Sequence, residues 1–222
     1  MRTIVVVSAG LSTPSTTKTL ADELANAAAS AIAARGEAHQ IVHIELRTLA
    51  TDLATALTTG GNRTPVLQDA HEAVASADGL IVVTPVFQAS YSGLFKMFFD
   101  TVEQDTLTTK PTLLAATAGT ARHSLVLDFA MRPLFSYLKA AMVPTAVFAA
   151  VEDFGGAHGS DLSKRIQRAT TELAQMMLVD ATTVGGLGGP FAAGAKTVRD
   201  TGLQQSDGEL STFERILSNH LE

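Results

Sequence analysis

Short apolar runs that favour strands alternate along this chain with stretches of helical periodicity. The first run, Ile4–Val7, is apolar at consecutive positions, which is typical of a strand buried on both faces. Comparable runs follow at His39–Leu46, Leu80–Val83, Pro111–Ala118 and Val143–Val151. Strands that alternate with helices form βαβ units, and these units build a parallel sheet with right-handed crossovers.

This pattern predicts an α/β fold with flavodoxin-like architecture, in which a five-stranded parallel sheet in the order 2-1-3-4-5 carries helices on both faces. Residues 1–180 are expected to form this domain, and residues 181–222 a Gly-rich linker or arm followed by a short helix, Ser211–Asn219. The helices expected within the domain are one that begins at Thr13 and Pro14 and stops at Gly36, then Thr48–Thr58, Pro65–Ala77, Leu94–Val102, Ser124–Met142 with a kink or new start at Pro133, and Asp161–Val179.

Composition narrows the classes of partner. The formal net charge is −6 and the isoelectric point about 5.5, which argues against nucleic acid and anionic membranes. The chain has no cysteine, so disulfides, thiolate metal sites and a cysteine nucleophile are excluded. Neither a leader pattern nor an apolar run long enough for a bilayer is seen, and a cytoplasmic protein is expected.

Three loops rich in Gly, Ser and Thr follow the first, third and fourth predicted strands: Ser8–Thr17, Thr84–Gly93 and Thr117–His123. In the predicted strand order they meet at the carboxyl edge of the sheet, where such folds bind ligands. Pro14 suits the first helical position, with Thr13 as N-cap. A helix N-terminus with several hydroxyls attracts a phosphate, although the same residues could serve only to cap the helix.

The second loop has the chemistry to hold a flat heteroaromatic ring. Pro85 makes it rigid, and its backbone groups are presented in succession, while Phe87 and Tyr91 offer an apolar wall. The alternative is that these aromatic residues belong to the core, which is the interpretation preferred for Phe98 and Phe99. Thr117–Thr120 supplies a second set of backbone donors nearby.

Three stretches carry a resemblance to a known family: AGLSTPSTT at Ala9–Thr17, TPVFQASYSGLFKMFFD at Thr84–Asp100, and ATAGTARHSLVLDFAMRPLFSYLKA at Ala116–Ala140. From about Arg2 to Asp153 the chain resembles the NAD(P)H-dependent FMN reductases. It is most similar to the reductase components of two-component monooxygenases such as the alkanesulfonate systems. The resemblance implies FMN as cofactor and NADPH or NADH as co-substrate, with the following flavin-binding residues: Ser8, Gly10, Ser12, Ser15, Thr16, Thr17, Pro85, Val86, Phe87, Gln88, Thr117, Ala118, Gly119 and Thr120.

Two positions depart from the family pattern. Many relatives have an arginine in the phosphate loop, where this chain has Ala9-Gly10-Leu11-Ser12, so a charge-assisted bond to phosphate is missing. Lys18 is a candidate to compensate for the missing arginine. Weaker neutralisation of the phosphate charge would favour FMN that binds and dissociates as a substrate does. Phe87 replaces the more usual tyrosine and keeps the ring. Arg122 and His123 are candidates to contact a phosphate of the nicotinamide nucleotide; the alternative is a solvated loop pair.

The function implied is hydride transfer from a reduced nicotinamide to N5 of FMN, with the reduced FMN supplied to a partner monooxygenase. Such a transfer needs no protein acid or base, so no catalytic residue is expected, and no metal site. The alternatives are a quinone or azo reductase with tightly bound FMN, and a flavodoxin-type electron carrier. By analogy with the family, a homodimer or a dimer of dimers is expected.

Overall fold

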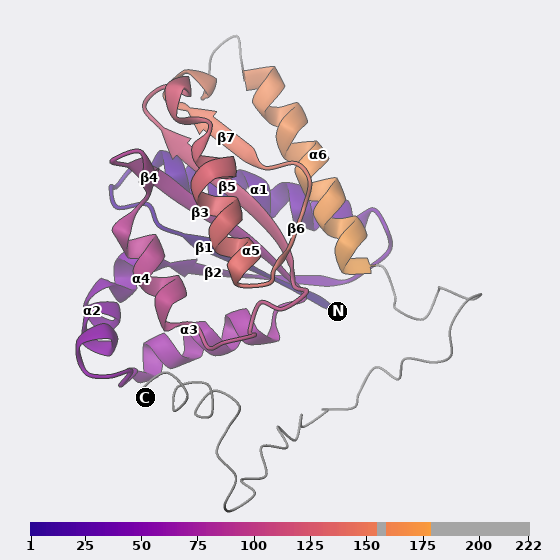
Figure 1. Ribbon diagram of the computed structural model, residues 1–222. Helices are drawn as coiled ribbons and strands as arrows, with labels where there is room; N and C mark the ends of the chain where they lie inside the picture. The colour runs from indigo at the N-terminus through magenta and orange to yellow at the C-terminus, as the bar shows by residue number, and fades with distance from the viewer. Residues whose placement is uncertain (155–158, 179–222) are drawn as a thin grey trace, which may run out of the picture. The chain divides into compact units, whose positions relative to one another are not determined.

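The computed structural model describes residues 1–154 and 159–178, which belong to a compact unit spanning Met1–Asp180 (Figure 1). The arm and short helix expected over residues 181–222 lie outside the described residues.

A mixed sheet with strands in the order β2-β1-β3-β5-β6 forms the centre of this unit; in addition, β4 pairs with β3 and β7 with β5. Every pairing is parallel except that of β3 with β4. The predicted flavodoxin-like class is confirmed, but the sheet has seven strands where five were predicted: β4 is an antiparallel addition, and β6 and β7 together take the place of the fifth strand. The strands are β1 Arg2–Ser8, β2 His39–Glu45, β3 Gly79–Phe87, β4 Ser90–Tyr91, β5 Pro111–Ala118, β6 Ala141–Met142 and β7 Val147–Ala150.

The fifth strand position is divided into two short pieces, and the prediction of one strand over Val143–Val151 was wrong. β6 pairs with the first residues of β5, and β7 pairs with its last four, Ala115–Ala118. Pro144 lies between the two pieces, and a proline has no N–H to donate to a ladder. Val151 begins a short 3-10 turn instead of ending a strand.

The helices mostly lie where the periodicity placed them. They are α1 Thr16–Ala33, η1 Leu46–Leu49, α2 Ala50–Thr58, α3 Pro65–Ser76, α4 Gly93–Thr101, η2 Ala121–His123, η3 Leu127–Met131, α5 Arg132–Tyr137, η4 Val151–Asp153 and α6 Gly159–Leu178.

The helical stretch expected over Ser124–Met142, with a kink or new start at Pro133, consists of two shorter elements. The first, η3, is a π-helical turn, and α5 follows it directly with Pro133 in its first turn, which confirms a new start there. Helical structure stops before Lys139, whose φ is +60°, and Ala141 already belongs to β6. Residues 138–142, which the sequence pattern placed in the helix, instead lead the chain from α5 into β6.

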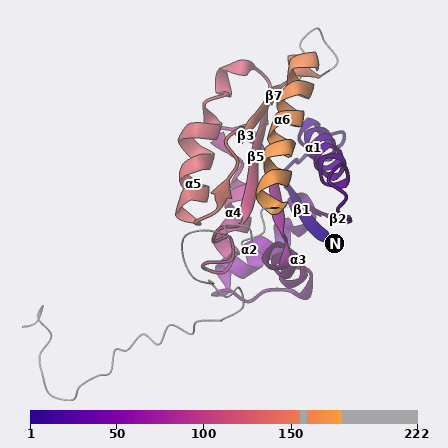
Figure 2. The ribbon, with the colours of Figure 1, turned by 90° about the vertical axis from the view of Figure 1, so that its right-hand side faces the viewer.

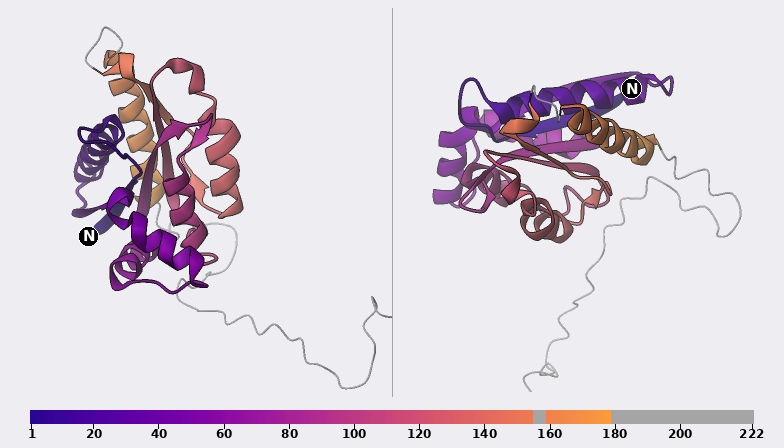
Figure 3. Two further views of the ribbon diagram at one scale, coloured as in Figure 1. Left: turned by 90° about the vertical axis from the view of Figure 1, so that its left-hand side faces the viewer. Right: turned by 90° about the horizontal axis from the view of Figure 1, so that it is seen from above.

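Two apolar clusters, one on each face, hold the helices to the sheet. Ile4 and Val6 pack with α1 and α6, whereas Val5 and Val7 pack with the cluster that α2, α3, α4 and α5 cover. Figure 2 shows α1 and α6 on one side of the sheet and α4 and α5 on the other, and both views of Figure 3 agree. Successive strand residues point to opposite faces, which explains why the strand runs are continuously apolar.

Candidate functional site

The parallel register brings the three predicted loops to one edge of the sheet. Ser8, the last residue of β1, pairs with Val83, and Pro85 near the end of β3 pairs with Thr117 near the end of β5. The backbone continues this contact beyond β1, since Ala9 N donates to Val83 O at 2.9 Å. The edge is the crevice where ligands bind in sheets of this order.

The turn after β1 leads into α1 two residues later than the sequence pattern suggested. Ser15 is the N-cap, and its Oγ accepts from Lys18 N at 3.2 Å. The prediction of Thr13 as N-cap and Pro14 as first helical residue was therefore wrong. Thr13-Pro14 is a cis peptide bond in the turn before the cap. The N–H groups that precede Lys18 in α1 have no acceptor within the helix, so they are available to an anion.

Gly10 is required by the close packing of this turn. A Cβ at this position would overlap Ser15 Oγ and would lie 3.2 Å from Thr17 Cβ. The absent side chain lets the turn fold back over the first residues of α1, so Gly10 shapes the loop.

A buried hydrogen bond joins the first loop to the third. Thr17 Oγ1 lies 2.8 Å from Thr117 Oγ1, and both side chains are buried. The bond therefore holds the start of α1 next to the end of β5.

The second loop is a hairpin, whereas the sequence predicted an open loop over Thr84–Gly93. β3 runs on to Phe87, and β4 returns antiparallel through a turn with Gln88 and Ala89 at positive φ. Thr84 Oγ1 accepts from Ser92 N at 3.0 Å and thereby closes the base of the hairpin. Pro85–Phe87 therefore belong to the end of β3, where pairing of Val86 and Phe87 with β4 fixes the backbone.

A cavity of about 330 Å³ lies between the three loops. It has the size of a small-molecule site, for which about 300–1,000 Å³ is usual. Ten predicted flavin-binding residues line it: Ser12, Ser15, Thr16, Thr17, Pro85, Val86, Phe87, Thr117, Ala118 and Gly119. The other four do not: Ser8 and Gly10 line a neighbouring cavity, and Gln88 and Thr120 are exposed and line neither.

Large apolar side chains stand exposed at the mouth of this cavity. Leu11, Phe87 and Val151 are 47%, 46% and 55% exposed, and all three line it. Sequence reasoning named only Phe87. Leu11 lies in the predicted phosphate loop and Val151 at the end of a predicted strand, so the sequence does not mark either residue as part of an apolar wall.

The chemistry of the lining fits FMN. Hydroxyls of Ser12, Ser15, Thr16 and Thr17 line it together with the start of α1, where helix N–H groups suit a phosphate. Val86, Phe87 and Val151 supply apolar lining, which suits a flat ring.

Lys18 is not the cation that the loop lacks. Its Nζ donates to both carboxylate oxygens of Asp22 at 3.0 Å and lies 3.5 Å from Glu45 Oε1. The hydrogen bond to Asp22 is the main reason that the pKa of Lys18 is raised. The charge of Lys18 is shared between Asp22 in α1 and Glu45 at the end of β2. These contacts do not support the suggestion that Lys18 compensates for the missing arginine. Arg122 and His123 are exposed in η2, and their contact with a nucleotide stays a prediction.

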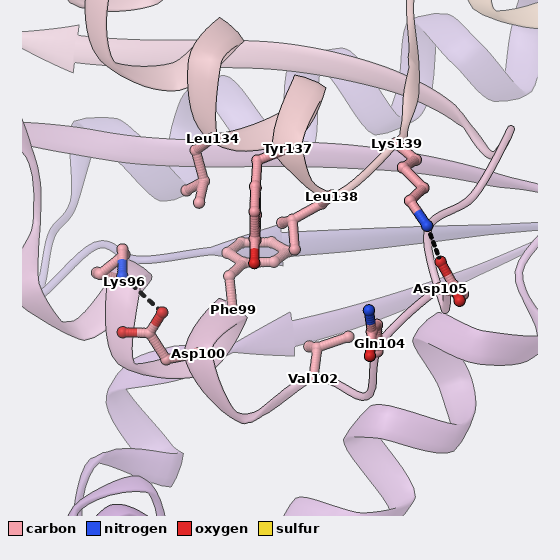
Figure 4. A pocket seen from close by; sticks show the side chains of 10 residues that line it. All are labelled: Lys96, Phe99, Asp100, Val102, Gln104, Asp105, Leu134, Tyr137, Leu138 and Lys139. Carbon is pink, nitrogen blue, oxygen red and sulfur yellow. Dashed lines mark hydrogen bonds and ion pairs between the residues drawn. The ribbon is translucent and has the colours of Figure 1, made fainter. Parts of the chain in front are cut away.

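A larger cavity, of about 620 Å³, lies away from the three loops, between α4, α5 and the segment after α4 (Figure 4). Phe99, Leu134 and Tyr137 contribute to its apolar surface. Its two lysines are ion-paired, Lys96 with Asp100 and Lys139 with Asp105, and it contains none of the predicted site residues.

Within residues 1–154 and 159–178 no helix is both long and apolar enough to cross a membrane. The same residues contain no cluster of three or more His, Asp or Glu side chains arranged to hold a metal ion.

Comparison with known proteins agrees with the geometry. The family model described as NADPH-dependent FMN reductase matches residues 2–155. The FMN reductase (NADPH) of Pseudomonas aeruginosa is 41% identical over 154 residues, which are 68% of this chain and 78% of that protein. The NADH-dependent FMN reductase SfnE of Pseudomonas putida is 42% identical over 147 residues, or 66% and 75%. An oxidoreductase structure from Corynebacterium diphtheriae is 55% identical with a TM-score of 0.79, and covers 82% of this chain and 99% of that one.

Proposed function

The chain belongs to the NADPH-dependent FMN reductase family, and from this premise we propose that it releases the FMN that it reduces, for use by a partner monooxygenase. Its activity is the NAD(P)H-dependent reduction of FMN, so FMN and a reduced nicotinamide nucleotide are its ligands.

In this proposal the flavin phosphate is held by the turn after β1 and the start of α1, through Ser12, Ser15, Thr16 and Thr17, with Gly10 shaping the turn. Hydroxyls and helix N–H groups that face one cavity support this assignment. The ring lies along Pro85–Phe87 and Thr117–Gly119, the parts of the predicted ring-binding segments that line the cavity, where backbone groups meet its edge.

When bound, FMN supplies the acceptor for the hydride of the reduced nicotinamide. The chain's own contribution is to hold and orient the two ligands and to keep water away from them. Leu11, Phe87 and Val151 serve this purpose, because an apolar rim around the ring excludes water. None of these roles needs a protein acid or base.

One observation carries the proposal that FMN leaves after reduction. Of the described residues that line the flavin cavity, none is a lysine or an arginine, and the nearby Lys18 is paired with acids. Neutral donors bind phosphate less strongly than charged ones do. A site that binds the phosphate mainly through neutral donors suits a flavin that is exchanged in each turnover.

Ultrafiltration after anaerobic reduction tests the release. The protein is mixed with FMN and excess NADPH or NADH under anaerobic conditions and passed through a membrane that retains it. We expect reduced FMN to pass into the filtrate, at the concentration of flavin that is not bound to the protein. Flavin retained with the protein at one per chain would contradict release and would favour a reductase with a resident cofactor.

We also propose that the chain forms a homodimer or a dimer of dimers. Leu125 lies just before η3, Phe129 in η3 and Tyr137 at the end of α5, and their side chains are 61%, 78% and 83% exposed, with spacings of four and eight residues. An exposed apolar row of this kind favours contact with another protein surface. Light scattering should give a multiple of the 23.2 kDa chain mass, and Phe129→Ser should lower it; a monomeric wild type would contradict the proposal.

A further inference from the structure

A cation reaches the phosphate turn from a distant part of the chain. Arg47, in η1 just after β2, donates from Nη1 to Thr13 Oγ1 at 2.5 Å, across 34 residues of sequence. Both residues line a cavity of about 370 Å³ that shares Ser12 and Ser15 with the flavin cavity. Arg47 therefore lies on the other side of the same turn.

The sheet register explains this meeting. β1 and β2 are parallel neighbours, and their last residues, Ser8 and Glu45, are paired. The segments that follow these two residues must emerge side by side at the carboxyl edge. One segment is the phosphate turn, and the other carries Arg47 two residues after Glu45.

The charges around Arg47 leave it better able than Lys18 to act on an anion. Lys18 is shared between Asp22 and Glu45. The hydrogen-bond partner of Arg47 is a neutral hydroxyl, and the carboxylate paired with it, Glu45 Oε2, is 3.8 Å from Nη2. This ion pair is longer than the contacts of Lys18 with Asp22 and Glu45, at 3.0 and 3.5 Å, so the charge of Arg47 is the less neutralised of the two.

We propose that Arg47 is the positioning cation of the flavin-phosphate site, which takes the place of the arginine that the turn lacks. It holds Thr13 and so fixes the turn, and its charge lowers the energy of a phosphate bound on the opposite side. The inference rests on the proposed function, because that function places the phosphate at this turn. The contribution of Arg47 to phosphate binding is modest, because its side chain is partly exposed and Glu45 offsets part of its charge. A modest contribution agrees with a flavin that is released.

Affinity for FMN compared with riboflavin tests the charge directly, because riboflavin carries the same ring without the phosphate. Arg47→Gln should raise the dissociation constant for FMN about fivefold, the usual size for a partly exposed charge interaction. Riboflavin binding, followed by the same fluorescence quenching, should not change. Arg47→Lys should recover part of the loss, and added salt should narrow the gap between wild type and Arg47→Gln.

Two further variants serve as a control for the loss of charge and as a change expected to tighten FMN binding. Arg35→Gln removes the same charge from an exposed arginine that follows α1 and donates to Ala31 O, so it should leave both affinities unchanged. Glu45→Gln removes the carboxylate shared by Arg47 and Lys18 and should tighten FMN binding.

An equal loss of FMN and riboflavin binding in Arg47→Gln would show a role in the fold of the turn alone and would overturn the inference. No change for either flavin would also overturn it. If the wild type bound no FMN, the proposed function itself would fail, and the inference with it.

Discussion

Thr17 and Thr117, one hundred residues apart, share a buried hydrogen bond between their side-chain oxygens at 2.8 Å. The bond joins the start of α1 to the end of β5, and both residues line the flavin cavity.

Breaking this bond should cost stability in a non-additive way. Thr17→Val or Thr117→Val leaves one buried hydroxyl without its partner, at a cost of about 1–3 kcal/mol. The double variant removes both hydroxyls and should lose less than the sum of the two single changes. Urea unfolding of the four proteins without flavin measures this; simple additivity would show that the two hydroxyls do not depend on each other.

Gly10→Ala should disturb the phosphate turn, because the added Cβ would overlap Ser15 Oγ. We expect FMN affinity to fall by about tenfold or more, as a displaced donor set would cause. Gly93→Ala is the matched control, since a Cβ at that residue, the first of α4, meets nothing within 4 Å. Equal affinities for FMN in the two variants would show that the turn tolerates the side chain.

His71 should make the protein less stable in mild acid. The ring is buried, Nε2 lies 3.1 Å from Thr101 Oγ1, and Nδ1 has no hydrogen-bond partner among the described residues. Burial, helped by the charge of Arg63 and opposed by Glu103, lowers the pKa of His71 from 6.5 to about 4. The unfolded chain then binds the proton more readily, so stability falls as the pH drops from about 6.5 towards 4, by at most about 3 kcal/mol.

The variant His71→Gln checks this assignment, because it keeps a donor for Thr101 but does not titrate. Chemical denaturation at several pH values should show a flatter profile for the variant than for the wild type over that range. Parallel profiles would assign the pH dependence to other groups.

Lys110 should be essential for stability, although it is charged. Its buried Nζ donates to Val74 O, Ala75 O and Ala77 O at 2.7–2.9 Å and so satisfies the carbonyls at the end of α3. Burial lowers the pKa of Lys110, but the three acceptors use all three of its protons. Lys110→Met should cost about 2–4 kcal/mol, because several buried carbonyls lose their donor.

Lys139→Met is the control for that change. Lys139 is exposed and pairs with Asp105 at the surface, where an ion pair contributes about 0–1 kcal/mol. If the two variants had similar melting temperatures, the buried ammonium would not be stabilising α3.

The strand order and the family could be predicted from the sequence because their signals are local. Each buried strand is a run of apolar residues, as Ile4–Val7 shows, and the resemblance rests on contiguous motifs. The family match over residues 2–155 confirms that resemblance.

Local signals were misleading where two residues could play the same part. Thr13 and Ser15 are both good N-caps, and Pro14 fits the first helical position by rule, so the sequence could not show that α1 begins later. The sequence also contains no sign that α5 ends at Tyr137. A positive φ after a helix usually falls on a glycine, but here it falls on Lys139.

Contacts between distant segments were out of reach for a different reason. Arg47 meets the phosphate turn only because Ser8 and Glu45 are paired in the sheet, and the sequence of η1 does not show this. Val151 reaches the flavin cavity because it follows Ala150, which pairs with Ala118 at the end of β5.

Steady-state oxidation of NADPH and NADH by the purified protein, titrated with free FMN, is the most direct measurement of the central claim. The account predicts a rate that rises with FMN and saturates, with little flavin in the protein as purified. No oxidation of either nucleotide at any FMN concentration would contradict it, even if FMN were bound, and would favour an electron carrier. A rate that ignored added FMN but required a quinone or an azo dye would contradict the role of FMN as a released product.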